Sequence, residues 1–323
     1  MTSERHSTRD QLIGADLLTL AMLSPARLAS IFDLAAAVKA DVRPYGESLR
    51  HKTAILIFEK PSLRTKVTFE VGIHRLGGTP IFLDQSASRL GERESIRDYG
   101  KNLERWCQFI VARVHSHRSL EELAEHARVP VINALSDRFH PCQALADLFT
   151  LRERLGSLEG VRLAFVGDGN NVCHSLMHAA SLLGVDTTVV TPPGYAPAED
   201  VTRECRGFAE SSGATLNITH DTAAVEGHHA VYTDVWVSMG QADQAAKRRR
   251  AFEDFRVDAA MMRLASRGIG REALFMHCLP AQRGVEVTDE VIDAPSSVVY
   301  DQAANRLHVQ NALMLRLLGA VGE

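Results

Sequence analysis

The chain has 323 residues, with 36 basic and 40 acidic side chains and a formal net charge of −4. Its hydrophobic fraction of 45 % and charged fraction of 24 % are typical of globular proteins and exclude a disordered or fibrous chain. The acidic balance argues against nucleic acid or a membrane surface as a partner, because both attract a basic excess. At roughly 100–200 residues per domain, the length predicts two domains.

The cysteines and the N-terminal segment indicate the compartment. The five cysteines form no CxxC pair and their number is odd, which disfavours a disulfide framework or a cysteine-rich zinc site. The first residues are polar and contain no signal-peptide core, and no apolar run approaches the ~20 residues of a membrane-spanning helix. We therefore expect a cytoplasmic protein without a membrane span.

Short apolar strands alternate with amphipathic helices in the first half of the chain. Ser119 is a plausible cap for one of these helices, with Glu122 at the capping-box position. The predicted strands are 53–58, 79–83, 109–114 and 129–135, and the predicted helices are 62–76, 94–106, 119–127 and 140–156. This alternation predicts a parallel sheet with helices on both faces.

The second half restarts the same pattern after a boundary at 155–160. Its predicted strands are 161–168, 186–192, 214–220, 229–236 and 273–281, and its predicted helices are 175–184, 198–213 and 305–318. The fold class is therefore α/β, with two doubly wound domains, 1–155 and 156–304. We expect the long helix 140–156 to join them and the C-terminal helix 305–320 to pack back on the first domain.

The segment FEKPSLRT (58–65) is the first indication of an anion site. It ends a strand and opens a helix, whose first N–H groups and partial positive charge face outward. Ser62 and Thr65 add hydroxyl donors, and Arg64 adds a planar fork suited to phosphate or carboxylate. An equally good alternative is that Ser62 only caps the helix and Arg64 is a surface charge.

Three further polar residues follow predicted strands. Arg113 ends the strand FIVARV, and ligands bind at the carboxyl ends of strands in such sheets. His140 and Gln143 open the next helix three residues apart, so both side chains lie on one face of its first turn. They could bind a carbonyl group, although Arg113 could be a solvated strand end and His140 a cap before Pro141.

Six segments in this order identify a family. They are FEKPSLRTKVTFEVGIHRLGG, ARVHSH, HPCQALAD, DVWVSMGQ, MHCLP and NRLHVQNALM. Over nearly the whole chain the sequence resembles the aspartate/ornithine carbamoyltransferase family. The SxRT and HPxQ motifs are shared across that family, whereas DxWxSMG together with HCLP is typical of its ornithine-type members.

The resemblance implies where carbamoyl phosphate binds. Its phosphate would be held by Ser62, the backbone of Leu63, Arg64 and Thr65, and Arg306 would close over it. Its carbonyl end would be polarised by Arg113, His140 and Gln143, with Cys278 and Leu279 nearby. Fixed donors at the carbamoyl oxygen suit this chemistry, because amine attack places negative charge there.

The resemblance also implies a site for the amino acid L-ornithine. Asn171 and the Ser238–Met239 segment would hold the α-carboxylate and its neighbours, and Asp234 would bind the α-amino group. Cys278 and the Leu279 carbonyl would position the δ-amine. The implied catalytic residues are Arg113, His140, Gln143 and Cys278, and the implied products are L-citrulline and phosphate.

The match departs from the family at Leu63, where relatives commonly have Thr, at Tyr99–Gly100, where they have Thr-Ala, and in the loop that carries Arg89. Three other motifs suggest different activities. Arg89 stands where relatives often carry Gln or His as a phosphate contact from a neighbouring subunit. The segment VGDGNN (166–171) lacks the third glycine of a dinucleotide-binding loop. The pairs His115/His117 and His228/His229 lack further ligands and are interpreted as surface histidines. The basic run 247–250 is interpreted as a solvated helix face. No metal and no cofactor is expected.

The acceptor and the assembly stay open at this point. A related acceptor such as putrescine or an acylated ornithine is the main alternative, and a catalytically silent regulatory member is a second one. The resemblance implies a homo-oligomer, a trimer or a multiple of it. Arginine biosynthesis is the expected setting, and degradative use stays open as well, because both run the same chemistry.

Overall fold

The computed structural model describes residues 12–237 and 242–321, and the chain divides into two compact units. The first unit comprises Met1–Leu145 with Arg306–Glu323, and the second comprises Ala146–Asn305. Helix α5 (Pro141–Leu155) and helix α11 (Val299–Leu317) each run from one unit into the other. The domain limits expected from the sequence, after residues 155 and 304, stay a prediction.

The first unit contains a four-stranded parallel sheet, as the alternation of strands and helices predicted. Its strands lie in the order β2 (Thr79–Asp84), β1 (Thr53–Phe58), β3 (Phe109–Arg113) and β4 (Val131–Leu135). β1 and β3 pair with Phe58 opposite Arg113. All residues of β3 are buried, which is typical of a strand covered on both faces.

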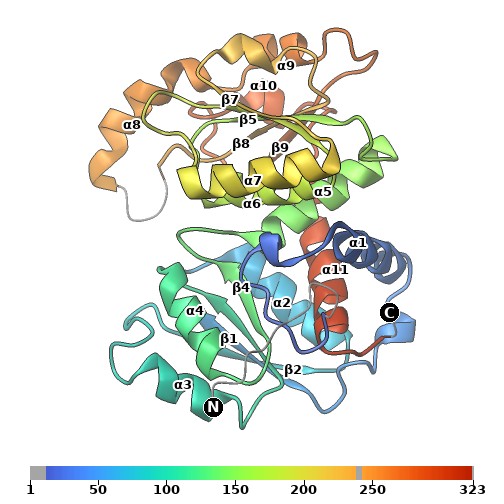
Figure 1. The fold of residues 1–323 in the computed structure, drawn as a ribbon, viewed down its shortest axis with the longest axis vertical. Coiled ribbons are helices and arrows are strands. Elements are labelled where there is room, and N and C mark those ends of the chain that lie inside the picture. The colour runs from blue at the N-terminus through green and yellow to red at the C-terminus, as the bar shows by residue number, and fades with distance from the viewer. Residues whose placement is uncertain (1–11, 238–241, 322–323) are drawn as a thin grey trace. The chain divides into compact units, whose positions relative to one another are not determined.

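Helices cover both faces of this sheet (Figure 1). They are α1 (Pro25–Ala40), α2 (Leu63–Arg75), α3 (Ile96–Leu103), α4 (His117–His126) and the C-terminal part of α11. One face packs against α3 and α4 through an apolar cluster that includes Ile57, Ala112, Leu103 and Leu120. Helix α1 was not predicted, and α4 begins two residues before the predicted cap.

The C-terminal helix packs against the first unit, as expected. Gly72 of α2 lies so close to Asn311 of α11 that an added Cβ would clash with the Asn311 amide oxygen. Arg316 donates to the carbonyl of Ser30 at 3.5 Å. The helix begins at Val299, six residues before the predicted start.

The second unit contains a five-stranded parallel sheet. Its strands lie in the order β7 (Leu216–Thr219), β6 (Asp186–Val190), β5 (Arg162–Val166), β8 (Ala230–Thr233) and β9 (Leu274–His277). Its helices are the rest of α5 and α11 with α6 (Asn171–Leu182), α7 (Glu199–Ser212), α8 (Ala245–Phe252), α9 (Ala259–Ala265) and α10 (Asp289–Ile292).

An apolar core fills one face of this second sheet. Val166, Val231 and Phe275 from the strands pack in one cluster with Phe252 of α8 and Met262 of α9. Helices α6 and α7 lie on the opposite face (Figure 1). The predicted doubly wound arrangement is therefore present in both units.

The strand orders locate a switch point in each sheet. In the first sheet, β1 is followed by its neighbour β2 on one side, and β3 is followed by its neighbour β4 on the other. The connections after β1 and β3 therefore leave in opposite directions. In the second sheet the equivalent pair is β5 and β8. Ligands of open α/β sheets bind outside the carboxyl ends of strands at such points.

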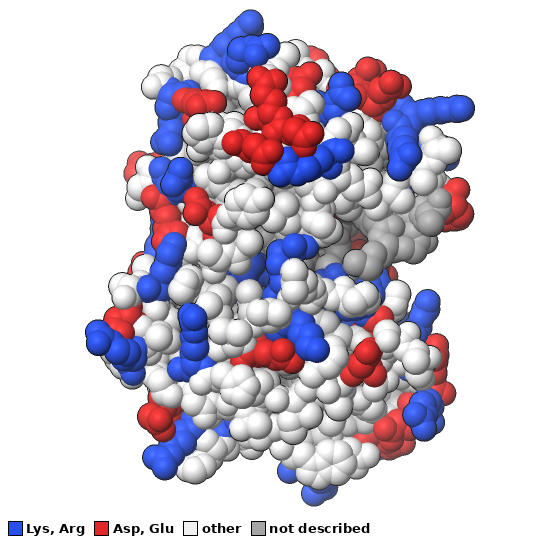
Figure 2. All heavy atoms as spheres, turned by 180° about the vertical axis from the view of Figure 1, so that it is seen from behind, with Lys and Arg blue, Asp and Glu red and all other residues white. Residues whose placement is uncertain are grey.

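Basic and acidic side chains are interspersed over the face drawn in Figure 2. Within residues 12–237 and 242–321, no helix combines the length and apolar character needed to cross a membrane.

Candidate functional site

At the switch point of the first unit, Glu59 ties three loops together. Its N–H donates to the Arg113 carbonyl at 2.9 Å, which continues the β1–β3 pairing by one residue. Its buried carboxylate accepts the N–H of Leu90 at 2.7 Å and the N–H of His115. Sequence reasoning missed this residue, because an acidic side chain after a strand has no local signature of burial.

The N-terminus of α2 opens at the same edge. Ser62 is its N-cap and accepts the N–H of Thr65 at 3.4 Å. Thr65 is buried, whereas the Leu63 side chain is 75 % exposed, so any role of Leu63 at this site falls to its backbone. The capping role expected as an alternative for Ser62 is present, and it is compatible with anion binding.

Arg306 of α11 joins this helix terminus to the start of α5. Its Nη1 donates to Oε1 of Gln143 at 2.6 Å, and its Nη2 donates to Oγ1 of Thr65 at 3.2 Å. All three side chains are buried. Gln310, one turn further along α11, accepts from Arg306 Nη2 at 3.0 Å when its amide oxygen faces the guanidinium.

His140 lies buried among cations. Burial lowers its pKa well below the usual value, and the charges of Arg306, Arg113 and Arg64 lower it further. Its imidazole is therefore neutral at neutral pH. The structure thus brings together three arginines and one neutral imidazole, which suits a doubly charged anion with an adjacent carbonyl group.

Two further cations lie near this group. Burial lowers the pKa of Lys60, and the neighbouring charges of Arg113 and Arg89 act in the same direction. Lys60 was missed from the sequence, although it stands inside the FEKPSLRT segment. Arg89 is exposed, and its backbone N–H donates to Glu92 at 2.9 Å.

A second polar group lies at the switch point of the second unit. Asn170 caps α6 and accepts the N–H groups of Val172 and Cys173 at 3.0 and 3.1 Å. Its amide nitrogen donates to Asp234, which follows β8, at 2.8 Å. Asn171, the residue expected from the resemblance, is the first residue of α6. Asn170 was missed, although it stands in the same motif.

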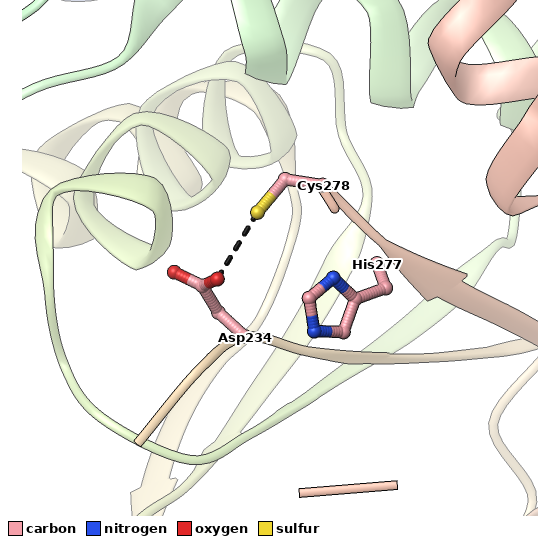
Figure 3. Close-up of side chains that lie close together, drawn as sticks. All are labelled: Asp234, His277 and Cys278. Atoms are coloured by element: carbon pink, nitrogen blue, oxygen red, sulfur yellow. Dashed lines mark hydrogen bonds between the residues drawn. The ribbon is translucent and has the colours of Figure 1, made fainter. Parts of the chain in front are cut away.

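Cys278 completes this second group. It follows β9, and its thiol donates to Oδ1 of Asp234 at 3.0 Å (Figure 3). Leu279 has a φ of +57°, and its N–H donates to Nδ1 of His277 at 2.8 Å. The carboxyl ends of β8 and β9 thus bring together a buried carboxylate, a thiol and the Leu279 backbone, and a carboxylate is the group that pairs with an ammonium.

Potential metal ligands meet at the same edge. Among the described residues, the ligand atoms of Asp234, His277 and Cys278 lie within 4.8 Å of one another. However, Nδ1 of His277 accepts the Leu279 N–H, and its Nε2 lies 3.2 Å from the buried carboxylate of Glu286. Both ring nitrogens are thus engaged within the protein, so the set does not fit a resident metal.

Arg248 of α8 bonds to two residues that follow the strands β5 and β8, near this second group. Its Nη1 donates to Oδ2 of Asp168 at 2.7 Å and to the Trp236 carbonyl at 3.0 Å. It is buried, which corrects the expectation that the whole run 247–250 is a solvated helix face. Ser238 and Met239, expected near the amino acid, lie outside the described residues.

Two histidines expected at the surface are buried. His228 lies 3.1 Å from the Thr188 hydroxyl, and His117 lies 2.9 Å from the Ser136 hydroxyl. No local pattern indicates this burial, because their partners are about 40 and 19 residues away along the chain.

Each α/β unit thus carries a group of charged side chains at its switch point, as in α/β proteins that bind small charged molecules. The chain belongs to the aspartate/ornithine carbamoyltransferase family. The carbamoyl-P binding domain of that family matches residues 15–153, and its Asp/Orn binding domain matches residues 159–317.

Individual relatives are similar over nearly their full length. The ornithine carbamoyltransferase of Thermus thermophilus is 48 % identical over 304 residues, which cover 94 % of this chain and 96 % of the relative. That of Shewanella oneidensis is 46 % identical over 300 residues, covering 93 % and 98 %. The solved ornithine carbamoyltransferase of Pyrococcus furiosus has a TM-score of 0.91 at 44 % identity, covering 96 % and 99 %.

Proposed function

We propose that this chain is an enzyme that transfers the carbamoyl group of carbamoyl phosphate to the δ-amine of L-ornithine, giving L-citrulline and phosphate. The observation that carries this proposal is the buried bridge that Arg306 makes to Gln143 at the start of α5 and to Thr65 at the start of α2. The family match and the ornithine carbamoyltransferase relatives support it.

The phosphate end of carbamoyl phosphate binds at the start of α2. The side chains of Ser62, Arg64 and Thr65 and the backbone of Leu63 face it, together with Arg306. The N–H groups of a helix terminus and two guanidinium forks match the three oxygens of a phosphate. Arg89 adds a further cation from its loop.

The carbonyl end lies against Arg113, His140 and Gln143. Because the Gln143 oxygen accepts from Arg306, its NH₂ group is the end that donates. These donors stabilise the negative charge that develops on the carbamoyl oxygen during attack. A neutral His140 serves here as a hydrogen-bonding group without adding a fourth cation.

The amino acid binds in the second unit. Asp234 receives the α-amino group, and Asn171, Ser238 and Met239 hold the α-carboxylate and its neighbours. The Cys278 thiol and the Leu279 carbonyl orient the δ-amine. Cys278 acts by position and not as a covalent nucleophile, because its thiol is a donor to Asp234.

The reaction is a direct displacement. The neutral δ-amine attacks the carbamoyl carbon and forms the C–N bond, which gives a tetrahedral species with its charge on the former carbonyl oxygen. The C–O bond to phosphate then breaks, and the departing phosphate takes the proton that the amine loses. Citrulline and phosphate account for all atoms.

An acceptor panel tests the assignment. Purified chain is supplied with carbamoyl phosphate and with L-ornithine, putrescine or N-acetylornithine, and the carbamoylated product is measured. We expect citrulline formation to dominate, because the Asp234 carboxylate meets a charged ammonium group only in an acceptor with a free α-amino group. A strong preference for putrescine or N-acetylornithine would overturn the ornithine assignment, and no product from any acceptor would indicate a silent member.

We further propose a homo-oligomer, a trimer or a multiple of it. Leu63 and Val67 of α2 and Ile81 of the edge strand β2 expose 75 %, 44 % and 44 % of their area. Exposed apolar side chains on one helix and the neighbouring edge strand suit a contact between copies. Light scattering at micromolar concentration tests this, and a monomeric mass would overturn it. Cytoplasmic localisation and a part in arginine biosynthesis complete the proposal.

A further inference from the structure

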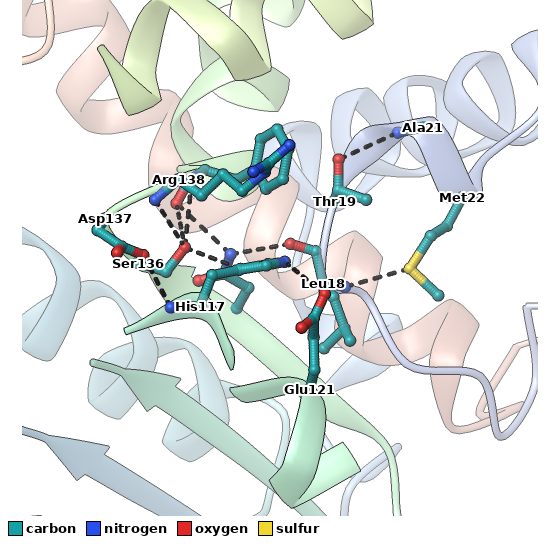
Figure 4. Close-up of polar contacts among 11 residues, drawn as sticks. Leu18, Thr19, Ala21, Met22, His117, Glu121, Ser136, Asp137 and Arg138 are labelled. Atoms are coloured by element: carbon teal, nitrogen blue, oxygen red, sulfur yellow. Dashed lines mark hydrogen bonds and ion pairs between the residues drawn. The ribbon is translucent and has the colours of Figure 1, made fainter. Parts of the chain in front are cut away.

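The turn between β4 and α5 is built around the Ser136 hydroxyl. Its oxygen accepts the N–H of Phe139 at 3.1 Å and the N–H of Arg138 at 3.3 Å, and the Ser136 N–H donates to the Phe139 carbonyl at 2.9 Å. Figure 4 shows this turn. His140 directly follows Phe139, its last residue. The geometry of this turn therefore decides where the His140 imidazole stands.

His117, the first residue of α4, receives the remaining hydrogen of that hydroxyl. Two backbone N–H groups occupy the lone pairs of the Ser136 oxygen, so its single hydrogen is left to donate. His117 Nδ1 lies at 2.9 Å, nearer than the Phe139 carbonyl at 3.4 Å. Nδ1 must therefore accept, which requires a neutral imidazole with its proton on Nε2.

The surroundings of His117 favour this neutral form. The ring is buried and packs edge-on against the Phe139 ring, with centroids 5.1 Å apart. Burial lowers the pKa of His117, and the charge of Arg138 lowers it further, while Glu121 and Asp137 oppose the shift. Nε2 lies 3.7 Å from Glu121, whose side chain is exposed.

A second bond locks the same two segments together. The N-cap position of α4, Ser116, makes no capping bond with its side chain, and Asp137 of the turn accepts the His117 N–H at 2.7 Å instead. Helix α4 and the turn thus hold each other through Ser136 and Asp137. Two polar atoms of the first residue of α4 are thus bonded to two successive residues of the turn.

We propose that His117 is a positioning residue of the carbamoyl phosphate site. By accepting the Ser136 hydroxyl proton, it fixes the turn at 136–139 and so sets where His140 meets the carbonyl group of the bound anion. This inference rests on the function proposed above. His117 does not touch the substrate, and its effect on the phosphate end is small.

Two ligands of the intact chain separate this role from general stability. Phosphonoacetamide carries a phosphonate and a carbonyl amide, whereas inorganic phosphate carries only the anion. His117→Phe keeps an aromatic ring against Phe139 but removes the acceptor. We expect it to weaken phosphonoacetamide binding about tenfold, as for one lost buried hydrogen bond, and to leave phosphate affinity within about twofold.

The binding of both ligands is measured by calorimetry. Conservative variants and a matched control complete this experiment. His117→Asn places an amide oxygen near the former Nδ1, so we expect near-native phosphonoacetamide binding. His117→Gln carries its amide one bond further out, near the former Nε2, and we expect it to behave like His117→Phe. These two polar variants keep the test valid if His117→Phe does not fold. His126→Phe, the same substitution in the last turn of α4, should change neither affinity.

The outcomes distinguish the inference from the function on which it rests. Equal weakening of both ligands, or no difference between the Asn and Gln variants, would overturn the positioning role. If the unmodified chain bound phosphate but not phosphonoacetamide, the proposed function would fail, and the inference with it. The positioning role is supported if the Phe and Gln variants bind phosphonoacetamide more weakly, with phosphate binding unchanged, and His117→Asn binds both ligands like the unmodified chain.

Discussion

Nη1 of Arg306 donates to Oε1 of Gln143 at 2.6 Å across 163 residues of sequence. The pair joins the C-terminal helix to the start of α5, and Nη2 of the same guanidinium reaches Thr65 at 3.2 Å. One planar side chain thus holds both ends of the proposed anion site, the phosphate end at α2 and the carbonyl end at α5.

Arg306→Lys tests whether this fork, and not only its charge, is needed. Lysine keeps the cation but cannot bridge Gln143 and Thr65 in one plane. We expect the KM for carbamoyl phosphate to rise roughly 10–100-fold, as for loss of a charge-assisted hydrogen bond, with the KM for ornithine little changed. Arg105→Lys, at an exposed arginine of the same unit, is the control. An unchanged KM for carbamoyl phosphate would argue against the bridging role.

Arg113→Ala tests stabilisation of the carbamoyl oxygen. Loss of one such donor typically costs ~2.7–4 kcal/mol, and we expect kcat to fall about 10²–10³-fold. Circular dichroism should show that the variant stays folded, since β3 keeps its backbone pairing. Near-native turnover would refute the role of Arg113. The control is Arg118→Ala at an exposed position of α4, which should leave kcat unchanged.

Much of the first site could be predicted because its residues sit beside local signals. Arg113 ends an apolar strand, and Ser62 to Thr65 open a helix. The spacing at the start of α5 indicated Gln143 and the family resemblance indicated Arg306, but the contact between them could not be found from local signals. Gln143 and Arg306 meet only because α5 and α11 fold back together, and no pattern within a few residues of either one encodes that contact.

The errors have the same physical origin. Sequence reasoning placed His117 at the surface, yet the turn at 136–139 covers it. Helix α4 begins two residues before the expected Ser119 cap, because the Asp137 side chain accepts the N–H of its first residue. Arg248 was expected to be solvated with its neighbours, yet helix periodicity turns it inward onto Asp168. Local propensity predicted where the helices and strands lie. Contacts with residues distant in the sequence determined where the helices end and which charged side chains are buried.

Asp234→Asn tests recognition of the α-amino group. The variant keeps the shape of the side chain and an oxygen that can accept from Cys278, but it loses the charge that faces the ammonium. We expect the KM for ornithine to rise roughly 10–100-fold. The KM for carbamoyl phosphate should stay constant, and the preference for ornithine over putrescine should narrow.

The exposed Asp254→Asn in the same unit is the matched control for this variant. A parallel rise in the KM values of both substrates would mean that Asp234 supports the fold of the second unit, and would remove it from the amino-acid site.

The pH dependence of turnover follows from which groups titrate. The pKa of His140 lies well below its usual value, so His140 is already neutral at pH 7 and does not change charge between neutral and alkaline pH. The δ-amine of ornithine, by contrast, must lose its proton to attack. We therefore expect kcat/KM for ornithine to rise from neutral into alkaline pH, and a flat profile over that range would contradict the mechanism.

Arg248→Met tests the buried ion pair beside the second site. Nη1 of Arg248 donates to the Asp168 carboxylate at 2.7 Å, and its guanidinium also lies over the Tyr195 ring, 5.0 Å from the ring centroid. Breaking a buried pair from one side leaves an uncompensated charge and costs about 3–5 kcal/mol. We expect a loss of that size in the free energy of unfolding, measured by urea denaturation.

Arg249→Met gives the matched control for this loss, because it makes the same change one residue along α8 at an exposed position. Its free energy of unfolding should differ from that of the unmodified chain by less than about 0.5 kcal/mol. Adding Asp168→Asn to Arg248→Met removes the stranded charge and should restore part of the loss. If Arg248→Met and Arg249→Met destabilise equally, the Asp168–Arg248 pair contributes nothing specific, and the connection from α8 to the end of β5 must be held by apolar packing alone.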